Sequence, residues 1–523
     1  MADHLGLRDR GLTVDVSYTL LLDIFGQSVS LWWIILPGMI LGTLVGILPG
    51  FSAQNTLIIL LPLTLYMKIE AGMALMISLY CTTQLGGGIP AILFNMPGEG
   101  GAAATVLDGY PMTKKGQAQQ ALVCCFAASA FGGLITTIIT MAMLPALAQL
   151  GLYFRSVEMV VVMVFGLTLI AAIAAQDLLK GLIAGFFGLM IGAIGIDPVF
   201  GTPRATFGFL ELYDGVPLIP ALIGLFAISE AFVMLESETI VRNEDLKTAK
   251  AARWADTMEG LYINGRYWWQ TIWTSLIGLV IGILPGAGAT IAAFLAYHYS
   301  KMLSKTPELY GTGHPPGVIA PESANNGVTS GTLVPVFALG IPGGTTGAIM
   351  MLVLTYHGVV LGPRLFIERP ELVYSVYMQM LVCYILMALL ILPMARYMSR
   401  VVWIPTKFLV PLILSLVTIA AFSEREYIFD MGLALFFGLV GYFARKGKYE
   451  VSAMLIGVIM GPLFETYFLR SMRLGQGDLT ILFSSTLANV LWVMVVLALF
   501  LPFIRNRKKA GVLAQTVRAG HES

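Results

Sequence analysis

The pentapeptide Gly46-Ile-Leu-Pro-Gly50 recurs letter for letter as Gly282-Ile-Leu-Pro-Gly286, and each copy interrupts a long apolar run. A second break follows each copy, at Asn95-Met-Pro-Gly98 in the first half of the chain and at Gly340-Ile-Pro-Gly343 in the second. Because glycine and proline disfavour helix, the sequence predicts helices that are broken at matching places in both halves. Interrupted membrane helices build the substrate sites of many secondary transporters. The pattern therefore predicts a duplicated transporter.

The composition is that of a membrane protein made of helices. Of the 523 residues, 57% are hydrophobic and 12% are charged, whereas soluble domains have about 25% charged residues. The mean hydropathy is +0.82, and the apolar segments suit helical spans of about 20 residues. A net charge of +1 gives no electrostatic basis for binding nucleic acid. We predict an all-α polytopic membrane protein surrounded by membrane lipid, with re-entrant hairpins and discontinuous helices.

The two halves share further residues in the same order, including Phe186-Phe-Gly-Leu189 and Phe436-Phe-Gly-Leu439. We predict two homologous halves, with inverted repeats favoured over parallel ones. The segments predicted to be re-entrant or discontinuous, because they are short or rich in glycine and proline, are 54–67, 70–96, 287–303 and 324–341. The predicted organisation is an N-terminal segment with a surface helix (1–28), a first transmembrane repeat (29–236), a charged and solvated connector (237–267), a second repeat (268–468), an extra C-terminal span (469–504) and a basic cytoplasmic tail (505–523).

In the first half, polar side chains follow both breaks. Ser52, Gln54 and Asn55 place hydroxyl and amide groups directly after the first break. A new helix is predicted to begin after Pro97-Gly98, and its free N–H groups would face an anion. A helix cap near the membrane interface remains the alternative for the first group. For Glu99, pairing, cation binding and simple solvation all remain open.

In the second half, the polar groups are more numerous. Pro285-Gly-Ala-Gly-Ala-Thr290 interrupts an apolar span and lacks the preceding strand that a dinucleotide-binding loop requires. Ala320-Pro-Glu-Ser-Ala-Asn-Asn326 carries Glu322 and three further polar residues in an apolar region. Intramembrane polar groups are functional candidates by default, although the two asparagines could instead tie hairpin backbones together.

These motifs contain no lysine or arginine. An anionic substrate would therefore be held by helix N-termini, hydroxyls and amides, with help from a bound cation. We find no firm metal site, but a coupling cation is predicted near Gly50, Gly286 and Asn325. The predicted substrate-binding residues are Ser52, Gln54, Asn55, Asn95, Pro97, Gly98, Gly286, Gly288, Thr290, Ser323, Asn325, Asn326, Gly343, Gly344, Thr345 and Thr346. The sequence contains no phosphate-binding loop and no nucleophile elbow, so we predict that it is not an enzyme.

Taken together, the motifs resemble those of a known family. They are Gly46-Ile-Leu-Pro-Gly50, Asn95-Met-Pro-Gly-Glu99, Leu107-Asp-Gly-Tyr-Pro111, Gly282-Ile-Leu-Pro-Gly-Ala-Gly-Ala-Thr290, Ala320-Pro-Glu-Ser-Ala-Asn-Asn326 and Leu339-Gly-Ile-Pro-Gly343. From about residue 20 to about residue 505, the chain is similar to the large permease subunit of bacterial tripartite tricarboxylate transporters. The resemblance implies a multi-pass secondary importer in the bacterial cytoplasmic (inner) membrane. It also implies a small transmembrane subunit, a periplasmic solute-binding protein and a carboxylate substrate, with uptake driven by Na⁺ or H⁺ and no cofactor.

The chain departs from the family pattern near Ser300, where an acidic residue is frequent, and at Thr312 and Pro316, where lysine and glutamate are frequent. These departures concern partner or substrate details rather than transport itself. A self-sufficient sodium- or proton-coupled carboxylate symporter that needs no partners is the alternative. The choice of carboxylate and the oligomeric state, including a homodimer, remain open.

Overall fold

The computed structural model describes residues 18–48, 51–151, 153–174, 178–197, 201–236, 254–286, 288–398 and 406–499. Six of its helices are long and apolar enough to cross a membrane, and a seventh span results if α1 and α2, which are bent by 60° at Leu31, count as one. The described residues contain one short two-stranded sheet and are otherwise mainly helical. The predicted all-α polytopic membrane fold is therefore confirmed.

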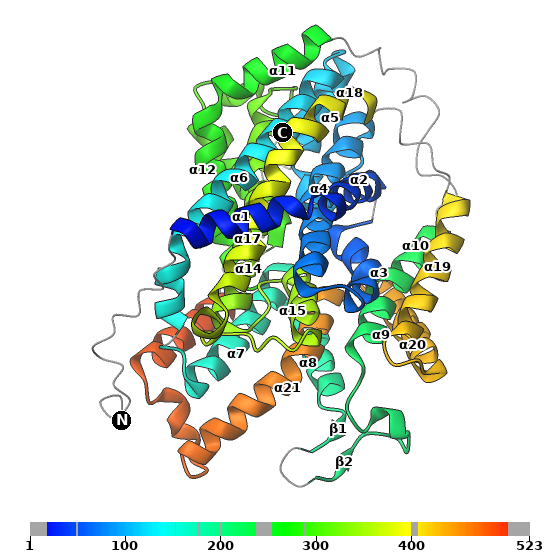
Figure 1. Cartoon of the computed structure of the whole chain (residues 1–523), viewed down its shortest axis with the longest axis vertical. Helices are drawn as coiled ribbons and strands as arrows, with labels where there is room; N and C mark the ends of the chain where they lie inside the picture. Colours follow the sequence, from blue (N-terminus) through cyan, green and yellow to red (C-terminus); the bar gives the residue numbers. More distant parts are fainter. Residues whose placement is uncertain are drawn as a thin grey trace, which may run out of the picture. The chain divides into compact units, whose positions relative to one another are not determined.

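The elements follow in chain order (Figure 1). Those up to residue 192 are α1 (Tyr18–Ser30), α2 (Trp32–Gly46), α3 (Ala53–Leu65), α4 (Ile69–Phe94), η1 (Gly100–Ala103), α5 (Val106–Lys114), α6 (Ala118–Gly151), α7 (Ser156–Ala174) and α8 (Leu178–Gly192). Those up to residue 303 are β1 (Gly195–Ile196), β2 (Pro203–Arg204), η2 (Leu210–Leu212), α9 (Leu218–Leu222), η3 (Ile223–Ile228), α10 (Ser229–Leu235), α11 (Trp254–Arg266), α12 (Trp268–Ile283) and α13 (Gly288–Leu303). The remainder are η5 (Pro307–Leu309), α14 (Pro316–Leu339), α15 (Thr345–Tyr356), α16 (Leu365–Glu368), α17 (Pro370–Leu386), η6 (Met387–Ile391), α18 (Leu392–Met398), α19 (Thr406–Ser423), α20 (Ile428–Lys446), α21 (Val451–Leu474), η7 (Leu479–Phe483) and a helix over Thr486–Leu499.

The chain forms two compact units, and each takes segments from both predicted halves. Unit 1 comprises residues 1–153 and 222–439, and unit 2 comprises 154–221 and 440–523. Homology between the halves is a statement about sequence, so this division leaves it a prediction. All four helix breaks lie in unit 1.

Helices α4 and α14 form the centre of unit 1. Every residue of α4 from Gly72 to Phe94 is buried, and so is every residue of α14 except its last. Helix α2 packs against α4, while α12, α13 and α6 pack against α14. The helices that follow the matching motifs in the two halves are therefore both interior.

The repeated glycines create close helix crossings. A Cβ atom on Gly46 would lie 2.9 Å from the Cα of Gly86, and one on Gly282 would lie 3.1 Å from the Cα of Gly331. Carbon atoms in ordinary contact are about 3.5 Å apart or more. The backbones of α2 and α4, and those of α12 and α14, therefore approach as closely as they do because these positions have no side chain.

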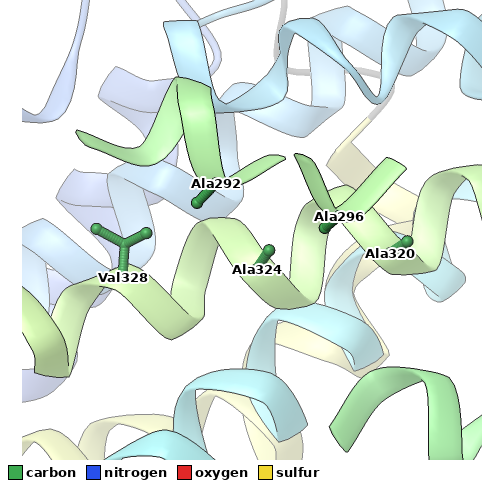
Figure 2. Close-up of a cluster of buried hydrophobic side chains, with 5 residues drawn as sticks. All are labelled: Ala292, Ala296, Ala320, Ala324 and Val328. Carbon is green, nitrogen blue, oxygen red and sulfur yellow. The ribbon is translucent and has the colours of Figure 1, made fainter. Parts of the chain in front are cut away.

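Alanines perform the same role between α13 and α14 (Figure 2). Ala292 and Ala296 of α13 form a buried cluster with Ala320, Ala324 and Val328 of α14. Residues four apart lie on one face of a helix, so each helix presents a row of small side chains to the other. Such rows allow close contact between helices where lipid provides no hydrophobic driving force.

Two sequence-based expectations about the central helices are wrong. Segment 70–96 is predicted to be re-entrant or discontinuous, but α4 runs unbroken from Ile69 to Phe94. Segment 324–341 is predicted to be re-entrant or discontinuous, but residues 324–339 belong to α14, a continuous helix that begins at Pro316 and contains the whole motif 320–326. Pro321 and Pro335 lie inside this helix without ending it, because its burial among the surrounding helices outweighs their helix-breaking tendency.

The connector also differs from the expectation. Residues 237–253 lie outside the described residues, but Trp254–Arg266 forms α11. Its Asn264 amide donates to the Cys124 carbonyl of α6 at 3.0 Å, and Gln119 of α6 donates to Thr257 at 3.1 Å. The second half of the predicted solvated connector is thus a helix packed on α6. At the N-terminal end of the chain, the expected surface helix is α1, which lies across α17 (Figure 1). At the C-terminal end, the predicted basic tail at 505–523 lies outside the described residues.

Unit 2 is held together by another glycine crossing and an ion pair. Gly188 of α8 meets the backbone of α21, where a Cβ would lie 3.0 Å from the Cα of Gly457. Arg204 donates hydrogen bonds to both carboxylate oxygens of Glu465, at 2.8 and 2.9 Å, and it also forms an ion pair with Asp197 at 3.2 Å. The hairpin that carries Arg204 is thereby fixed to α21.

Candidate functional site

In each half, the two helix breaks meet. The N–H of Gly98 donates to the Gly87 carbonyl at 3.0 Å, and a Cβ on Gly98 would collide with the carbonyl oxygen of Gly46. In the second half, the N–H of Gly286 donates to the Gly343 carbonyl at 2.9 Å. A backbone N–H of the break is thus satisfied by helix α4 in the first half and by the neighbouring break in the second.

Helices α4 and α14 end in the same way. Asn95 and Gly340 follow them with φ angles of 60° and 68°. The N–H groups of Met96 and Ile341 then donate back to the carbonyls of Pro90 and Pro335, each at 3.3 Å. Glycine and asparagine are the residues that most readily adopt this left-handed helix cap. Asn95 therefore has a structural reason for its place in the motif.

The two halves meet at these breaks. Asn325 of α14 donates to a carboxylate oxygen of Glu99 at 3.1 Å, and the Tyr80 hydroxyl donates to Thr332 at 3.4 Å. Side chains on Gly100 and Gly101 would collide with Thr290 and Asn325 respectively. We call this region the junction, defined as residues 98–101, 286, 288–290, 343–346 and Asn325.

Several predicted site residues lie at the junction and retain some exposure. Ser52 precedes α3, and Glu99 accepts the N–H of Ala53 at the start of that helix. Thr346, in the first turn of α15, interacts with the hydroxyl of Tyr80. The partly or fully exposed members of the predicted set are Ser52, Gln54, Asn95, Pro97, Gly286, Gly288, Thr290, Gly344, Thr345 and Thr346.

Two helices near the junction are not capped by the residue that precedes them, although Glu99 accepts the first N–H of α3. Neither Ser52 before α3 nor Gly344 before α15 forms a side-chain hydrogen bond to its helix. Free N–H groups at a helix start attract anions. The expected helix start at Pro97-Gly98 is wrong, because a short 3₁₀ turn follows and α5 begins at Val106. That position therefore offers no helix dipole to a substrate.

Ser323 and Asn326 face other neighbours. The hydroxyl of Ser323 lies 2.6 Å from that of Thr274 on α12, and Tyr384 of α17 donates to the Asn326 backbone carbonyl at 3.2 Å. Both side chains are completely buried. These contacts agree with the alternative that polar residues of the motif join helices, whereas Asn325 reaches the junction. Asn55, Gly98 and Gly343 are also buried, and Gly50 lies outside the described residues.

Glu322 is a second carboxyl group close to the junction. It is completely buried and accepts hydrogen bonds from Thr105 at 2.6 Å and Ser129 at 3.1 Å. Thr105 and Ser129 were not singled out from the sequence, because single polar residues in apolar stretches are common and neither belongs to a repeated motif. The same holds for Tyr80 and Thr332.

Asp108 joins the first half to the loop before α14. Its buried carboxylate accepts the hydroxyl of Tyr297 at 2.9 Å and the N–H groups of Gly311, Gly313 and His314 at 2.8 to 3.0 Å. Burial lowers the pKa of His314, so its ring is neutral at pH 7 and the carboxylate is held by hydrogen bonds rather than by a paired cation. Asp108 follows the junction residues by seven to ten positions and so fixes this segment against α13 and α14.

An all-helical membrane protein whose helix breaks converge on a partly exposed polar junction has the features of a membrane transporter. Comparison with known sequences agrees. The chain matches the tripartite tricarboxylate transporter TctA family over residues 31–456, and it belongs to this family. Family membership confirms the resemblance noted in the motifs and implies a transporter rather than an enzyme.

Two relatives come from Agrobacterium vitis. An uncharacterized 52.8 kDa protein in the TAR-I ttuC' 3' region is 32% identical over 475 residues, which cover 90% of this chain and 93% of the relative. An uncharacterized protein in the TAR-II ttuC' 3' region is 32% identical over 235 residues, which cover 44% of this chain and 97% of the relative. No solved structure matches the chain.

Proposed function

We propose that this protein is the large permease subunit of a tripartite system that imports organic carboxylates, either tricarboxylates or dicarboxylates, across the bacterial inner membrane. A periplasmic binding protein would deliver the substrate, and a small transmembrane subunit would complete the permease. Import is secondary active transport driven by Na⁺ or H⁺. Family membership supports the substrate class and the tripartite assembly.

The convergence of helix breaks from both halves is the observation that carries the proposal. The carboxylate substrate binds at the junction, where the N-terminus of α15 offers N–H groups and Thr290, Thr345 and Thr346 offer hydroxyls. A cation near Gly286 and Asn325 offsets the substrate's negative charge, because the helix breaks and the polar residues that follow them include no lysine or arginine. The two halves are inverted repeats, which would allow the junction to open to either side in turn.

Uptake of radioactive citrate into proteoliposomes tests the proposal. The chain is reconstituted alone, or with the small subunit and binding protein of the same bacterium, under an imposed sodium or pH gradient. We expect uptake when all three proteins are present and little uptake by the chain alone. Full uptake by the chain alone would establish the self-sufficient symporter instead. Absence of uptake for citrate and for a panel of other dicarboxylates and tricarboxylates would reject carboxylate transport.

A matched pair of variants links uptake to the junction. Thr346→Val keeps the shape of the side chain but removes its hydroxyl, and we expect it to raise the KM for citrate. Thr355→Val makes the same change at the other end of α15, where the hydroxyl bonds only to the Met351 carbonyl among the described residues. It should leave the KM unchanged. Equal KM values for the two variants would remove Thr346 from the site.

A further inference from the structure

The carboxylate of Glu99 lies at the junction without a cationic partner. It accepts the Asn325 amide at 3.1 Å and the Ala53 N–H, and the half-buried side chain keeps contact with solvent. In the part of the chain that the structure describes, no lysine or arginine forms an ion pair with Glu99 or with the neighbouring Glu322. An ionisable side chain inside a membrane protein is a candidate functional group.

Asn325 provides a second, independent indication. Its Oδ1 is completely buried and has no donor among the described residues. In the structure the Nδ2 of this amide points to the Glu99 carboxylate, so its Oδ1 points away from that carboxylate. The free Oδ1 therefore faces the glycines at positions 100 and 101, where a Cβ on Gly101 would collide with it. A buried acceptor without a donor is costly unless a ligand satisfies it.

Two more amide oxygens near Glu99 lack donors. Gln84 Oε1 is buried and unpaired, and Gln84 shares one face of α4 with Tyr80 and Gly87, which both lie next to Glu99. Asn55 Oδ1 is likewise buried and unpaired, two residues beyond the Ala53 N–H that Glu99 accepts. Both oxygens belong to side chains on helix segments that contact Glu99 through other residues.

We propose that Glu99, the Asn325 amide oxygen and Gln84 bind one sodium ion. This inference rests on the function proposed above, and it identifies the coupling cation of that transporter and the charged residue that holds it. One carboxylate and neutral amide oxygens match a hard monovalent cation, which prefers oxygen ligands.

The number of amide oxygens without a donor favours sodium over a proton as the ligand. A proton on Glu99 could satisfy one of the three unpaired amide oxygens, whereas an alkali cation binds several oxygens at once. A divalent ion is a poorer match, because both oxygens of Glu322 are already held by Thr105 and Ser129. The described residues contain no cluster of three histidine, cysteine or acidic side chains that would hold a transition metal.

Binding of radioactive sodium to the purified full chain in detergent tests the proposal at constant pH. The wild-type protein should bind about one ion per chain, displaced by unlabelled sodium but not by potassium. Glu99→Gln should weaken binding by about tenfold or more, which corresponds to at least about 1.4 kcal/mol. Glu308→Gln, an exposed acid on η5 of the same unit, is the matched control and should bind like the wild type.

Asn325→Ala and Gln84→Met serve as second variants if Glu99→Gln elutes as aggregate in gel filtration. Each removes one ligand oxygen and keeps the charge of Glu99, so each should weaken sodium binding. The proposal is overturned if the wild type shows no saturable sodium binding, or if folded variants at Glu99, Asn325 and Gln84 bind as tightly as the wild type.

Failure of this inference and failure of the proposed function give different results. Citrate uptake driven by a pH gradient in sodium-free buffer, with no sodium binding, would overturn the sodium site and leave carboxylate transport standing. Saturable sodium binding to a protein that never moves a carboxylate would reject the transport function and keep the site.

Discussion

The crossing of α12 and α14 at Gly282 allows a quantitative test of how the repeated motif determines the fold. In Gly282→Ala, the new Cβ would lie 2.6 Å from the carbonyl oxygen of Val328 and 3.1 Å from the Cα of Gly331. Ordinary contact requires about 3.5 Å, so the helices must separate locally by roughly 0.9 Å. Both obstacles are backbone atoms, which cannot turn away as a side chain would.

Overpacking of this kind costs about 1–3 kcal/mol. Gly265→Ala is the matched control, because Gly265 also precedes the last residue of its helix and has no atom within 4 Å of its Cβ position. A surface substitution of this type should change the free energy of unfolding by less than about 0.5 kcal/mol. The two alanine variants should therefore differ clearly in stability although their chemistry is the same.

The size of the effect decides the assay. With an unfolding entropy of about 2 cal/mol/K per residue, a chain of this length shifts its melting temperature by only about 1 °C per kcal/mol. Gly282→Leu is therefore measured beside Gly282→Ala by thermal denaturation in detergent, followed by gel filtration. We expect a loss of a few degrees for alanine and a larger loss for leucine. A Gly282→Leu protein that melts like the wild type would refute the close crossing.

Two further predictions concern the polar anchors. Asp108→Ala leaves the N–H groups of Gly311, Gly313 and His314 without their acceptor. Hydrogen bonds to a charged group are worth about 1.5–3 kcal/mol each, so the melting temperature should fall by several degrees. A fall no larger than that of an alanine variant at an exposed aspartate would show that Asp108 does not anchor the loop. The second variant is Arg204→Lys, whose ammonium group cannot form the two parallel hydrogen bonds that the Arg204 guanidinium donates to Glu465. Limited proteolysis should then cleave the hairpin at 195–215 faster than in the wild type, and unchanged cleavage would show that the ion pair does not hold it.

The sequence predicted the fold class and the positions of the helix breaks because both follow from local chemistry. A break requires glycine or proline at specific positions, and Gly46, Pro97, Gly282 and Gly340 mark such positions. The ends of α4 and α14 could be placed to within two residues for the same reason. Long apolar runs between polar breaks are likewise visible without any tertiary contact.

The interior of α14 could not be predicted, because tertiary packing decides it. Proline and asparagine at positions 321, 325 and 326 have a local preference against helix. Burial of α14 on all sides reverses that preference, since the segment has no water to bond to outside the helix. The packing of α14 also decides which neighbour each of its polar side chains contacts. Asn325 donates to Glu99, whereas the next residue, Asn326, accepts from Tyr384.

The partners of Glu322 illustrate a further limit. Thr105 and Ser129 lie more than 190 positions away in the sequence, and no spacing rule connects them to it. Asp108 was visible in the motif at 107–111, but the loop that it binds was not, because the contact consists of backbone N–H groups that any sequence possesses.

Cysteine labelling at the junction tests the central claim most directly. The four native cysteines are buried, so a single cysteine at Ser52 or Thr346, which are partly exposed, can be followed against a low background. We predict that a water-soluble thiol reagent modifies both positions in membranes and that transported carboxylates slow the modification. A cysteine at Ser78, which is completely buried in α4, should remain unmodified. Absence of labelling at Ser52 and Thr346, or labelling that no carboxylate slows, would contradict a carboxylate site formed where the broken helices meet.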